Sequence, residues 1–245
     1  MRVAVISDIH GNALALDAVL ADLSGEAIDQ GVCLGDAVQG GAQPAETVAR
    51  LRELGWPVVI GNADAWLLTG EETGDEGTAT PWMLAVREWS LGQLSEEDRR
   101  YIVGFRPTVE FALPGGRGLL CAHGTPRSFD DIIVPETPDA EVVEMIGPVG
   151  NAIVCGGHTH TQQLRHLGES FFFNPGSVSL PFRRALAESP PRVGRWAEYA
   201  VLTAEEDGGV RIEFRRVAYD VERSVAAILG SGMPEAERLA GRYRV

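Results

Sequence analysis

The sequence predicts an α/β fold with two sheets and a helical insertion at about residues 65–104. Apolar runs and helical patterns follow one another in the order β-α-β-α-β at the start of the chain, which is typical of a mostly parallel sheet covered by helices. After the insertion the pattern changes to short strands separated by turns. The chain has 245 residues, 44% hydrophobic and 23% charged, so we expect a single globular domain over 1–245.

The first three elements are a buried strand, a helix and a second strand. The run RVAVIS at 2–7 is apolar and largely β-branched, as in a strand buried on both faces. Asn12 is placed to cap a helix whose apolar side chains recur at helical spacing until Gly25. The run AIDQGVCL at 27–34 is predicted to be the second strand.

A second helix and a third strand come next. Pro44 suits the first turn of this helix, and Gly55 stands just past its end. The run PVVI at 57–60 is predicted to be the third strand. The polar, glycine-rich stretch at 69–80 is predicted to be a surface loop.

The rest of the chain is predicted to be two helices, a series of short strands and further helices. The helices begin near Pro81 and at Ser95, where Ser95 and Asp98 resemble a capping box. One helix at about 138–146 interrupts the strands, and terminal helices are expected from Asp220 and Pro234. The predicted strands are VEFAL, GLLCAH, NAIVC, QQLRHL, SFFFN, EYAVLTA and VRIEFRRVAY.

Charge and composition exclude several classes of partner. The net charge of -14 argues against binding to long nucleic acid or to an anionic membrane surface, although metal ions would attract a small anionic substrate. The apolar runs are too short for a membrane span or a signal peptide, so we expect a cytoplasmic protein. Cys33, Cys121 and Cys155 are predicted to be reduced thiols in the core.

Polar side chains collect where the predicted strands end. In open α/β sheets this end of the strands forms the ligand crevice. Asp8 with His10, and His158 with His160, are spaced by two residues, so an extended backbone would point the two side chains of each pair the same way. A single Asp or His there is usually a turn former, but the joint pattern predicts one shared site. Its members are Asp8, His10, Asp36, Asn62, Asp64, His123, His158 and His160.

The mixture of ligand types indicates which metals would bind. Imidazoles combined with carboxylates and an amide oxygen suit Mn²⁺, Fe or Zn²⁺ better than Ca²⁺ or Mg²⁺. The set is too large for one tetrahedral zinc ion, but it fits two ions that share a bridging carboxylate. The sequence therefore predicts a site for two metal ions, and no organic cofactor is expected.

The motifs also resemble a known family, the calcineurin-like metallophosphoesterases, and most closely its small bacterial phosphodiesterase-like members. This resemblance implies a four-layer α/β/β/α sandwich of two mixed sheets, with a dinuclear metal site at the C-terminal ends of the strands. It rests on DIHGN (8–12), LGDAVQGG (34–41), GNAD (61–64), AHGTP (122–126), GGHTH (156–160) and NPGS (174–177), which occur in this order.

The resemblance assigns a role to each candidate ligand. Asp8, His10 and His160 would hold the first metal, and Asn62, His123 and His158 the second, with Asp36 bridging the two ions. Asp36, Asn62 and His123 are also the expected catalytic residues. Mn²⁺ is the expected metal, with Fe and Zn²⁺ as alternatives. Asn174 is expected to support the ligands or to fix its loop.

The expected activity is hydrolysis of phosphodiester or pyrophosphate-type bonds in a small or nucleotide substrate, by attack of a metal-bridged hydroxide. Many family members carry a His directly after Gly-Asn, where this chain has Ala63, so the leaving-group proton would come from water or Asp64. The alternatives are a phosphomonoesterase or protein phosphatase, and a non-catalytic metal-binding interaction scaffold. Arg127, Arg183 and Arg184 are candidates for contacts with phosphate.

Overall fold

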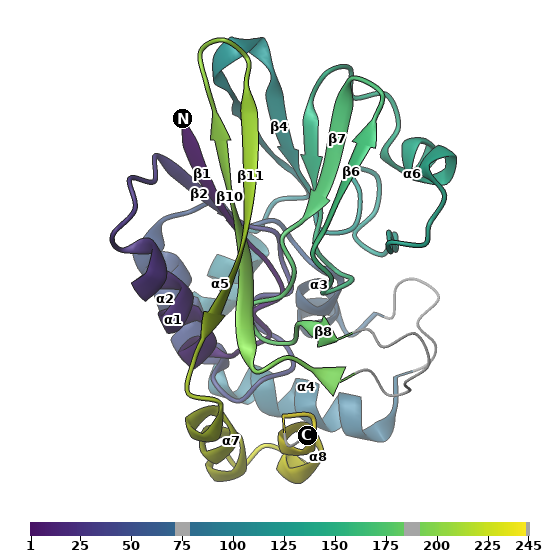
Figure 1. The fold of residues 1–245 in the computed structure, drawn as a ribbon. Helices are drawn as coiled ribbons and strands as arrows, with labels where there is room; N and C mark the ends of the chain where they lie inside the picture. Colours follow the sequence, from purple (N-terminus) through teal and green to yellow (C-terminus); the bar gives the residue numbers. More distant parts are fainter. Residues whose placement is uncertain (72–78, 184–191, 244–245) are drawn as a thin grey trace.

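The computed structural model describes residues 1–71, 79–183 and 192–243. Two sheets stand face to face in the upper part of Figure 1, and helices cover their outer faces. The predicted loop at 69–80 lies mostly outside the described residues. No helix in the described part of the chain is long and apolar enough to cross a membrane.

The first sheet has the order β11-β10-β1-β2 and is mixed. β1 pairs in parallel with β2 and antiparallel with β10, which in turn pairs antiparallel with β11. The central position of β1 agrees with its continuous apolar sequence. The strands are β1 (Arg2–Ile6), β2 (Gln30–Cys33), β10 (Trp196–Ala204) and β11 (Val210–Ala218).

The second sheet has the order β3-β4-β5-β7-β6. Its three central strands run in parallel, and the two edge strands are antiparallel to their neighbours. A separate pair, β8 (Phe182–Arg183) with β9 (Arg192–Val193), was not predicted because two residues are too few to give a pattern. The sheet strands are β3 (Val109–Ala112), β4 (Gly118–Cys121), β5 (Ile153–Cys155), β6 (Gln163–Leu167) and β7 (Ser170–Asn174).

The helices begin and end largely where the sequence predicts. Asn12 Oδ1 accepts a hydrogen bond of 3.1 Å from the amide of Ala15, and Gly55 ends α2 in the left-handed conformation. Ser95 and Asp98 form the predicted capping box. The helices are α1 (Ala13–Leu23), α2 (Pro44–Leu54), α3 (Asn62–Thr69), α4 (Pro81–Gln93), α5 (Glu96–Val103), α6 (Asp139–Ile146), α7 (Val221–Gly230) and α8 (Ala236–Gly241), with a short 3₁₀ turn at Pro114–Gly116.

Alternation along the strands explains the four layers. Val3 and Val5 on β1 point into a core between the two sheets, which they share with Leu119 of β4. The alternate residues of β1, Ala4 and Ile6, pack on the other face in a core that includes residues of α1 and α2. The outer face of the second sheet packs in the same way against α6. The α/β/β/α sandwich that the sequence implied is confirmed.

Two predicted strands in the first half need correction. Residues 57–60 form only isolated bridges, one between Val58 and Cys33 and one between Val59 and Arg106. Pro57 has no amide hydrogen to donate to a ladder, and the chain enters α3 at Asn62, so no regular strand develops. The second strand is also shorter than the predicted 27–34.

The three cysteines that the sequence placed in the core as reduced thiols are free and buried.

Candidate metal centre

The candidate ligands lie together at the C-terminal ends of four strands and at the start of one helix. Asp8 and His10 follow β1, Asp36 follows β2, His123 follows β4, and His158 and His160 follow β5, while Asn62 is the first residue of α3. Backbone hydrogen bonds join the loops after β1 and β2. The amide of Asp8 donates to the carbonyl of Gly35 at 3.0 Å, and that of His10 to the carbonyl of Asp36 at 2.8 Å.

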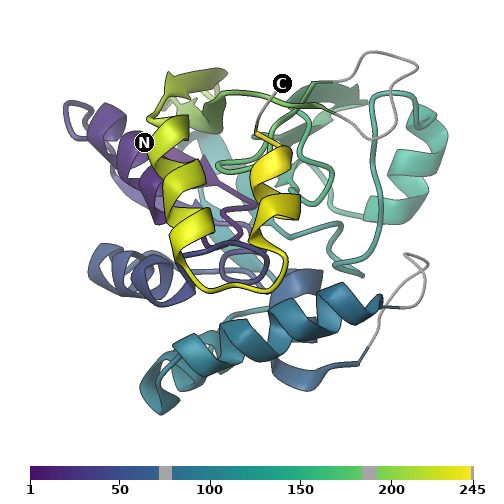
Figure 2. The ribbon, with the colours of Figure 1, turned by 90° about the horizontal axis from the view of Figure 1, so that it is seen from below.

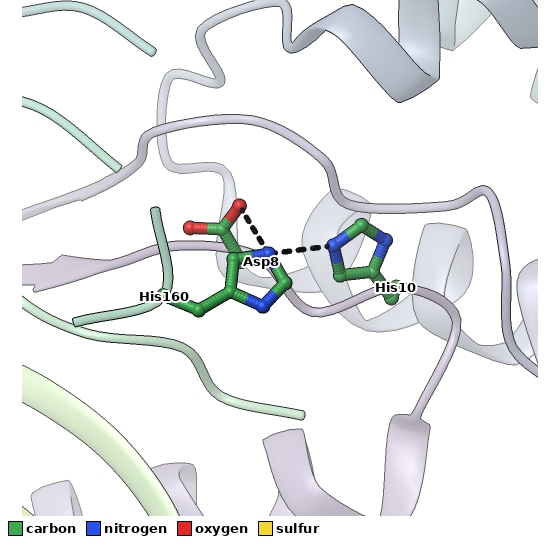
Figure 3. Close-up of side chains that lie close together, drawn as sticks. All are labelled: Asp8, His10 and His160. Carbon is green, nitrogen blue, oxygen red and sulfur yellow. Dashed lines mark hydrogen bonds and ion pairs between the residues drawn. The ribbon is translucent and has the colours of Figure 1, made fainter. Parts of the chain in front are cut away.

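One cluster consists of Asp8, His10 and His160, whose possible ligand atoms all lie within 4.8 Å of one another. Figure 3 shows the three side chains turned toward a common point. His160 Nε2 lies 3.2 Å from Asp8 Oδ1 and 3.1 Å from His10 Nε2. Asp8 Oδ1 is buried, and its contact among the described residues is with His160, itself a candidate ligand, so both groups can turn to a shared cation.

A second cluster consists of Asp36, His123 and His158, also within 4.8 Å of one another. His123 Nε2 lies 3.5 Å from Asp36 Oδ2 and 3.0 Å from Asn62 Oδ1, which brings the amide of Asn62 to the same place. His10 of the first cluster lies 3.8 Å from Asp36 Oδ2. Asp36 is therefore within reach of both clusters, as a bridging ligand must be.

Backbone carbonyls orient three of the imidazoles. His10 Nδ1 lies 2.8 Å from the Gln39 carbonyl, His123 Nδ1 lies 2.8 Å from that of Leu34, and His160 Nδ1 lies 3.0 Å from that of Leu180. A carbonyl only accepts hydrogen bonds, so each Nδ1 must carry the hydrogen. In the neutral ring Nε2 then keeps a lone pair directed into the cluster, which is the arrangement of a metal-bound histidine.

The backbone at the ligand residues is not extended, which corrects one step of the sequence argument. The φ angles are positive at 55° for Asp8, 46° for His10, 48° for Asp36, 66° for His158 and 53° for His160. Side chains spaced by two residues therefore do not simply point the same way. Asp8 and His10 join the same cluster, but His158 and His160 join different ones. Such left-handed residues cost about 1–3 kcal/mol each and concentrate at functional sites.

Two glycines allow the loops to approach the ligand side chains. A Cβ on Gly61 would lie 2.1 Å from Asp36 Oδ1, and one on Gly157 would lie 2.0 Å from Ser7 Oγ and 2.8 Å from Asp8 Oδ2. All three distances are below van der Waals contact. The glycines of GNAD and GGHTH are thus required by the packing of the site itself.

Charges within the site determine its protonation. Burial is the largest single influence on Asp36 and disfavours its ionised form, but the charge and hydrogen bond of His123, together with the charges of His10 and His158, outweigh it and hold the pKa of Asp36 below its ordinary value. Burial also opposes ionisation of His123, yet Asp36 raises its pKa to about 10. Burial, followed by the charge of His123, lowers the pKa of His158 to about 4, so His158 is a neutral potential ligand at neutral pH.

Two further residues named from the sequence hold loops. Asp64 is fully buried, and its carboxylate accepts hydrogen bonds of 3.0–3.1 Å from the amides of Ala37 and Val38, next to Asp36. Asn174 Nδ2 donates to the Gly157 carbonyl, and its Oδ1 accepts from the amide of Gly176. Asp64 is not among the described residues that line the cavity beside the clusters.

A cavity of about 390 Å³ adjoins both clusters. Ala63 lines it where many family members carry histidine, and the Ala63 amide donates to Asp36 Oδ1 at 2.8 Å. The sequence did not identify most of the other lining residues, because they come from α3, α4 and the segments around β8 and α8, whose packing leaves no local pattern. These include Trp66, Trp82, Met83, Val86, Leu180, Phe182, Leu239 and Arg242.

Of the three arginines suggested from the sequence, Arg127 has a described side chain, and it lies away from the described cavity lining. Arg127 Nε pairs with Asp131 at 2.8 Å on the surface, and Arg127 is not among the described cavity residues. Arg183 lies in β8, where only its backbone is described, and Arg184 lies outside the described residues.

The four-layer sandwich and its paired clusters of candidate ligands define the class of the metallophosphoesterases. The chain belongs to the calcineurin-like phosphoesterase superfamily, whose domain model matches residues 1–207. The family is metal-dependent, and the two clusters are candidate sites for its ions.

Individual relatives span nearly the whole chain. A metallophosphoesterase from Sphaerobacter thermophilus is 26% identical with a TM-score of 0.73, over 100% of this chain and 98% of that one. A hypothetical protein from Pyrococcus horikoshii shares the fold with a TM-score of 0.80 at 21% identity, covering 98% of this chain and 97% of its own. An uncharacterized protein of Methanocaldococcus jannaschii is 27% identical over 247 residues, which are 97% of this chain and 96% of the relative.

Proposed function

We propose that this protein is a dinuclear metal-dependent phosphodiesterase that hydrolyses phosphodiester or pyrophosphate-type bonds of a small or nucleotide substrate. The observation that carries the proposal is the pair of three-residue clusters with Asp36 within reach of both. Asp8, His10 and His160 would hold one ion, and Asn62, His123 and His158 the other, with Asp36 within reach of both. We propose Mn²⁺ as the metal because of this ligand mixture, with Fe and Zn²⁺ as alternatives.

The ions would supply a water of lowered pKa and would neutralise the charge of the phosphoryl oxygens. The protein's own groups orient this chemistry. Three backbone carbonyls fix the imidazole rings, and buried Asp36 keeps its negative charge between the clusters. Asn62 presents an amide that ligates through its oxygen and can donate to a phosphoryl oxygen through its nitrogen.

The side chain at position 63 supports the choice of phosphodiester or pyrophosphate-type bonds whose leaving group departs without a proton. Ala63 lines the cavity beside Asn62 and has no proton to give to a departing oxygen. Asp64, the alternative donor, is engaged with the amides of the Asp36 loop. A missing general acid is worth about 10²–10⁴-fold in rate. Substrates whose leaving group departs as a stable anion should therefore react fastest.

The test compares bis-p-nitrophenyl phosphate with p-nitrophenyl phosphate, using chelator-stripped protein to which Mn²⁺ is added back. We expect metal-dependent cleavage that is faster on the diester. Faster cleavage of the monoester would leave a metal-dependent phosphoesterase but overturn the diester assignment. Cleavage of neither substrate, with two ions bound, would favour the non-catalytic interaction scaffold.

Variants of one residue from each cluster test the ligand assignment. Asp8→Asn and His158→Ala are each expected to lower kcat by at least about 10²-fold while the circular dichroism spectrum stays native. His166→Ala is the matched control, because His166 lies outside the clusters and packs its ring on Phe171. Unchanged hydrolysis in either ligand variant would refute the assignment of that cluster.

A further inference from the structure

The cavity beside the metal clusters has a second wall that lies outside the family domain. Helix α8 follows residue 207, where the match to the family ends, and its Leu239 and the following Arg242 line the cavity. Figure 2 shows α8 beside α4, the long helix of the insertion. Trp82 Nε1 donates to the Pro234 carbonyl at 3.3 Å, and the Arg238 guanidinium lies 4.5 Å from the centre of the Trp82 ring.

This wall is held firmly against the ligand loops. Tyr243 is buried, and its hydroxyl lies 3.0 Å from Ser179 Oγ. The amide of Ser179 donates to the carbonyl of Asp8, which bears one of the candidate ligands. Leu239 is likewise buried, in a core cluster that includes Val86 of α4. The segment from α8 to Tyr243 is therefore a fixed part of the cavity.

Apart from the metal clusters and Arg242, the cavity lining is largely apolar and aromatic. Trp66, Trp82 and Met83 contribute from the insertion, and Phe182 and Leu239 from later parts of the chain. Phe182 also stacks on His160, with ring centres 4.7 Å apart, so the aromatic surface begins at the metal cluster itself. Apolar cavities of ~300–1,000 Å³ with a few polar groups take ligands of nucleoside size and larger, and about 390 Å³ falls in this range.

Arg242 gives this apolar surface a charged end. Among the described residues that line the cavity it is the only lysine or arginine, and it forms no ion pair within the described part of the chain. The protein as a whole carries a net charge of -14, so an unpaired cation at the cavity is a local exception that attracts anions. Arginine binds phosphate through two parallel hydrogen bonds.

Building on the proposed function, we propose that the substrate is a nucleotide-like ester with an aromatic, nucleoside-sized group and a second anionic group. The reacting phosphoryl group lies at the metal clusters, the aromatic group packs on the apolar surface, and the second anion pairs with Arg242. Arg242 is thus a specificity-determining residue, and it does not take part in the chemical step.

Binding of three ligands to the Mn²⁺-loaded protein, measured by isothermal titration calorimetry, tests this proposal. Methyl phosphate has only a phosphoryl group, thymidine 5′-monophosphate adds the aromatic group, and thymidine 3′,5′-bisphosphate adds a second anion. We expect affinity to rise at each step, the last by about tenfold, which is typical of one charged hydrogen-bonded contact. In Arg242→Gln the gain in affinity from the second anion should disappear, while the gain from the aromatic group remains.

The controls separate this inference from the proposed function. Arg223→Gln removes the same charge from α7, away from the described cavity lining, and should keep all three affinities. Cleavage of bis-p-nitrophenyl phosphate by the native protein tests the phosphodiesterase separately, and it should be equal in Arg223→Gln, which lies away from the described cavity lining. The role of Arg242 would be overturned if the native protein bound the two thymidine ligands equally. It would also be overturned if the bisphosphate still bound more tightly than the monophosphate in Arg242→Gln. Equal binding of methyl phosphate and thymidine 5′-monophosphate would overturn the aromatic site.

Discussion

At the scale of single residues, the imidazoles depend on backbone carbonyls for their orientation. His10, His123 and His160 each place Nδ1 within 3.0 Å of a carbonyl oxygen, and these carbonyls lie 29, 89 and 20 residues away in sequence. The loops that carry Gln39 and Leu180 therefore determine where the Nε2 lone pairs point. A substitution in either loop should change metal affinity without touching a ligand.

Metal binding should release protons. Burial opposes the charged imidazole of His123, but Asp36 raises its pKa to about 10, and Asp8 in the same way raises the pKa of His160. These rings must lose a proton to bind a metal, so affinity should rise as the pH increases from about 6 to about 8. Calorimetric titration with Mn²⁺ at pH 7, in buffers of different ionisation enthalpy, should show net release of about one proton or more. Proton uptake would contradict this prediction.

Asp64 is predicted to matter for stability and for metal binding together. Its carboxylate accepts hydrogen bonds from the amides of Ala37 and Val38 in the loop that carries Asp36, so Asp64→Asn places a buried side-chain NH₂ donor against the Ala37 amide. The free energy of unfolding should fall by about 1–3 kcal/mol, and the Mn²⁺ affinity should fall with it. Urea denaturation and calorimetry measure the two effects. Asp17→Asn is the control, because Asp17 makes an exposed ion pair with Arg50 and should have little effect on either.

At the scale of the elements, the sequence predicted strands and helices best where a pattern repeats. Features that depend on local chemistry could be predicted. They are the apolar run of β1, the caps of α1 and α5 and the Gly after α2. The prediction of a strand at 57–60 was wrong, because an apolar run does not show whether partner strands lie along its length. The pairs β8 and β9 are too short to give a pattern.

The candidate site was predicted from the sequence only in part. Strand ends bring polar residues together in any open α/β sheet, so the ligand set followed from their positions. The left-handed backbone at Asp8, Asp36 and His158 was not foreseen, because nothing local distinguishes these residues from an extended chain. Arg242 and Leu239 were missed because their place at the cavity depends on how α8 packs.

The capping box of α5 offers a test of stability that leaves the site alone. Ser95 Oγ accepts from the amide of Asp98 at 3.1 Å, and Asp98 Oδ2 accepts from the amide of Ser95 at 3.0 Å. Ser95→Ala should cost about 1 kcal/mol, which lowers Tm by about 2–4 °C in a protein of this size. Because no described residue of α5 lines the cavity, hydrolysis at 25 °C should not change. A larger loss of activity than of stability would place α5 in the site.

At the scale of the whole molecule, the two sheets carry different halves of each cluster. Asp8 and His10 come from the first sheet and His160 from the second, and the same holds for Asp36 with His123 and His158. The metal clusters thus span the seam between the sheets. Ions bound there add to the apolar core in holding the two layers together.

Mn²⁺ should therefore raise the thermal stability of the native protein. A ligand at about one hundred times its Kd adds about 2.7 kcal/mol for each site that forms only in the folded state. Differential scanning calorimetry should show Tm rising with Mn²⁺ and returning on chelation. In Asp8→Asn the rise in Tm caused by Mn²⁺ should be smaller but still present, since the second cluster remains intact. An equal increment in this variant would place the ions elsewhere.

The distance along the chain between cluster members also has a kinetic consequence. His10 and His160 stand 150 residues apart, and Asn62 and His123 stand 61 apart. Neither cluster can be complete until both sheets have formed and docked, so an ion finds no finished site on a chain that is still folding. Contacts that form only after the transition state slow unfolding without speeding folding, and we expect the metal contacts to be of this kind. Bound ions would then lower the unfolding rate and so lengthen the lifetime of the native state.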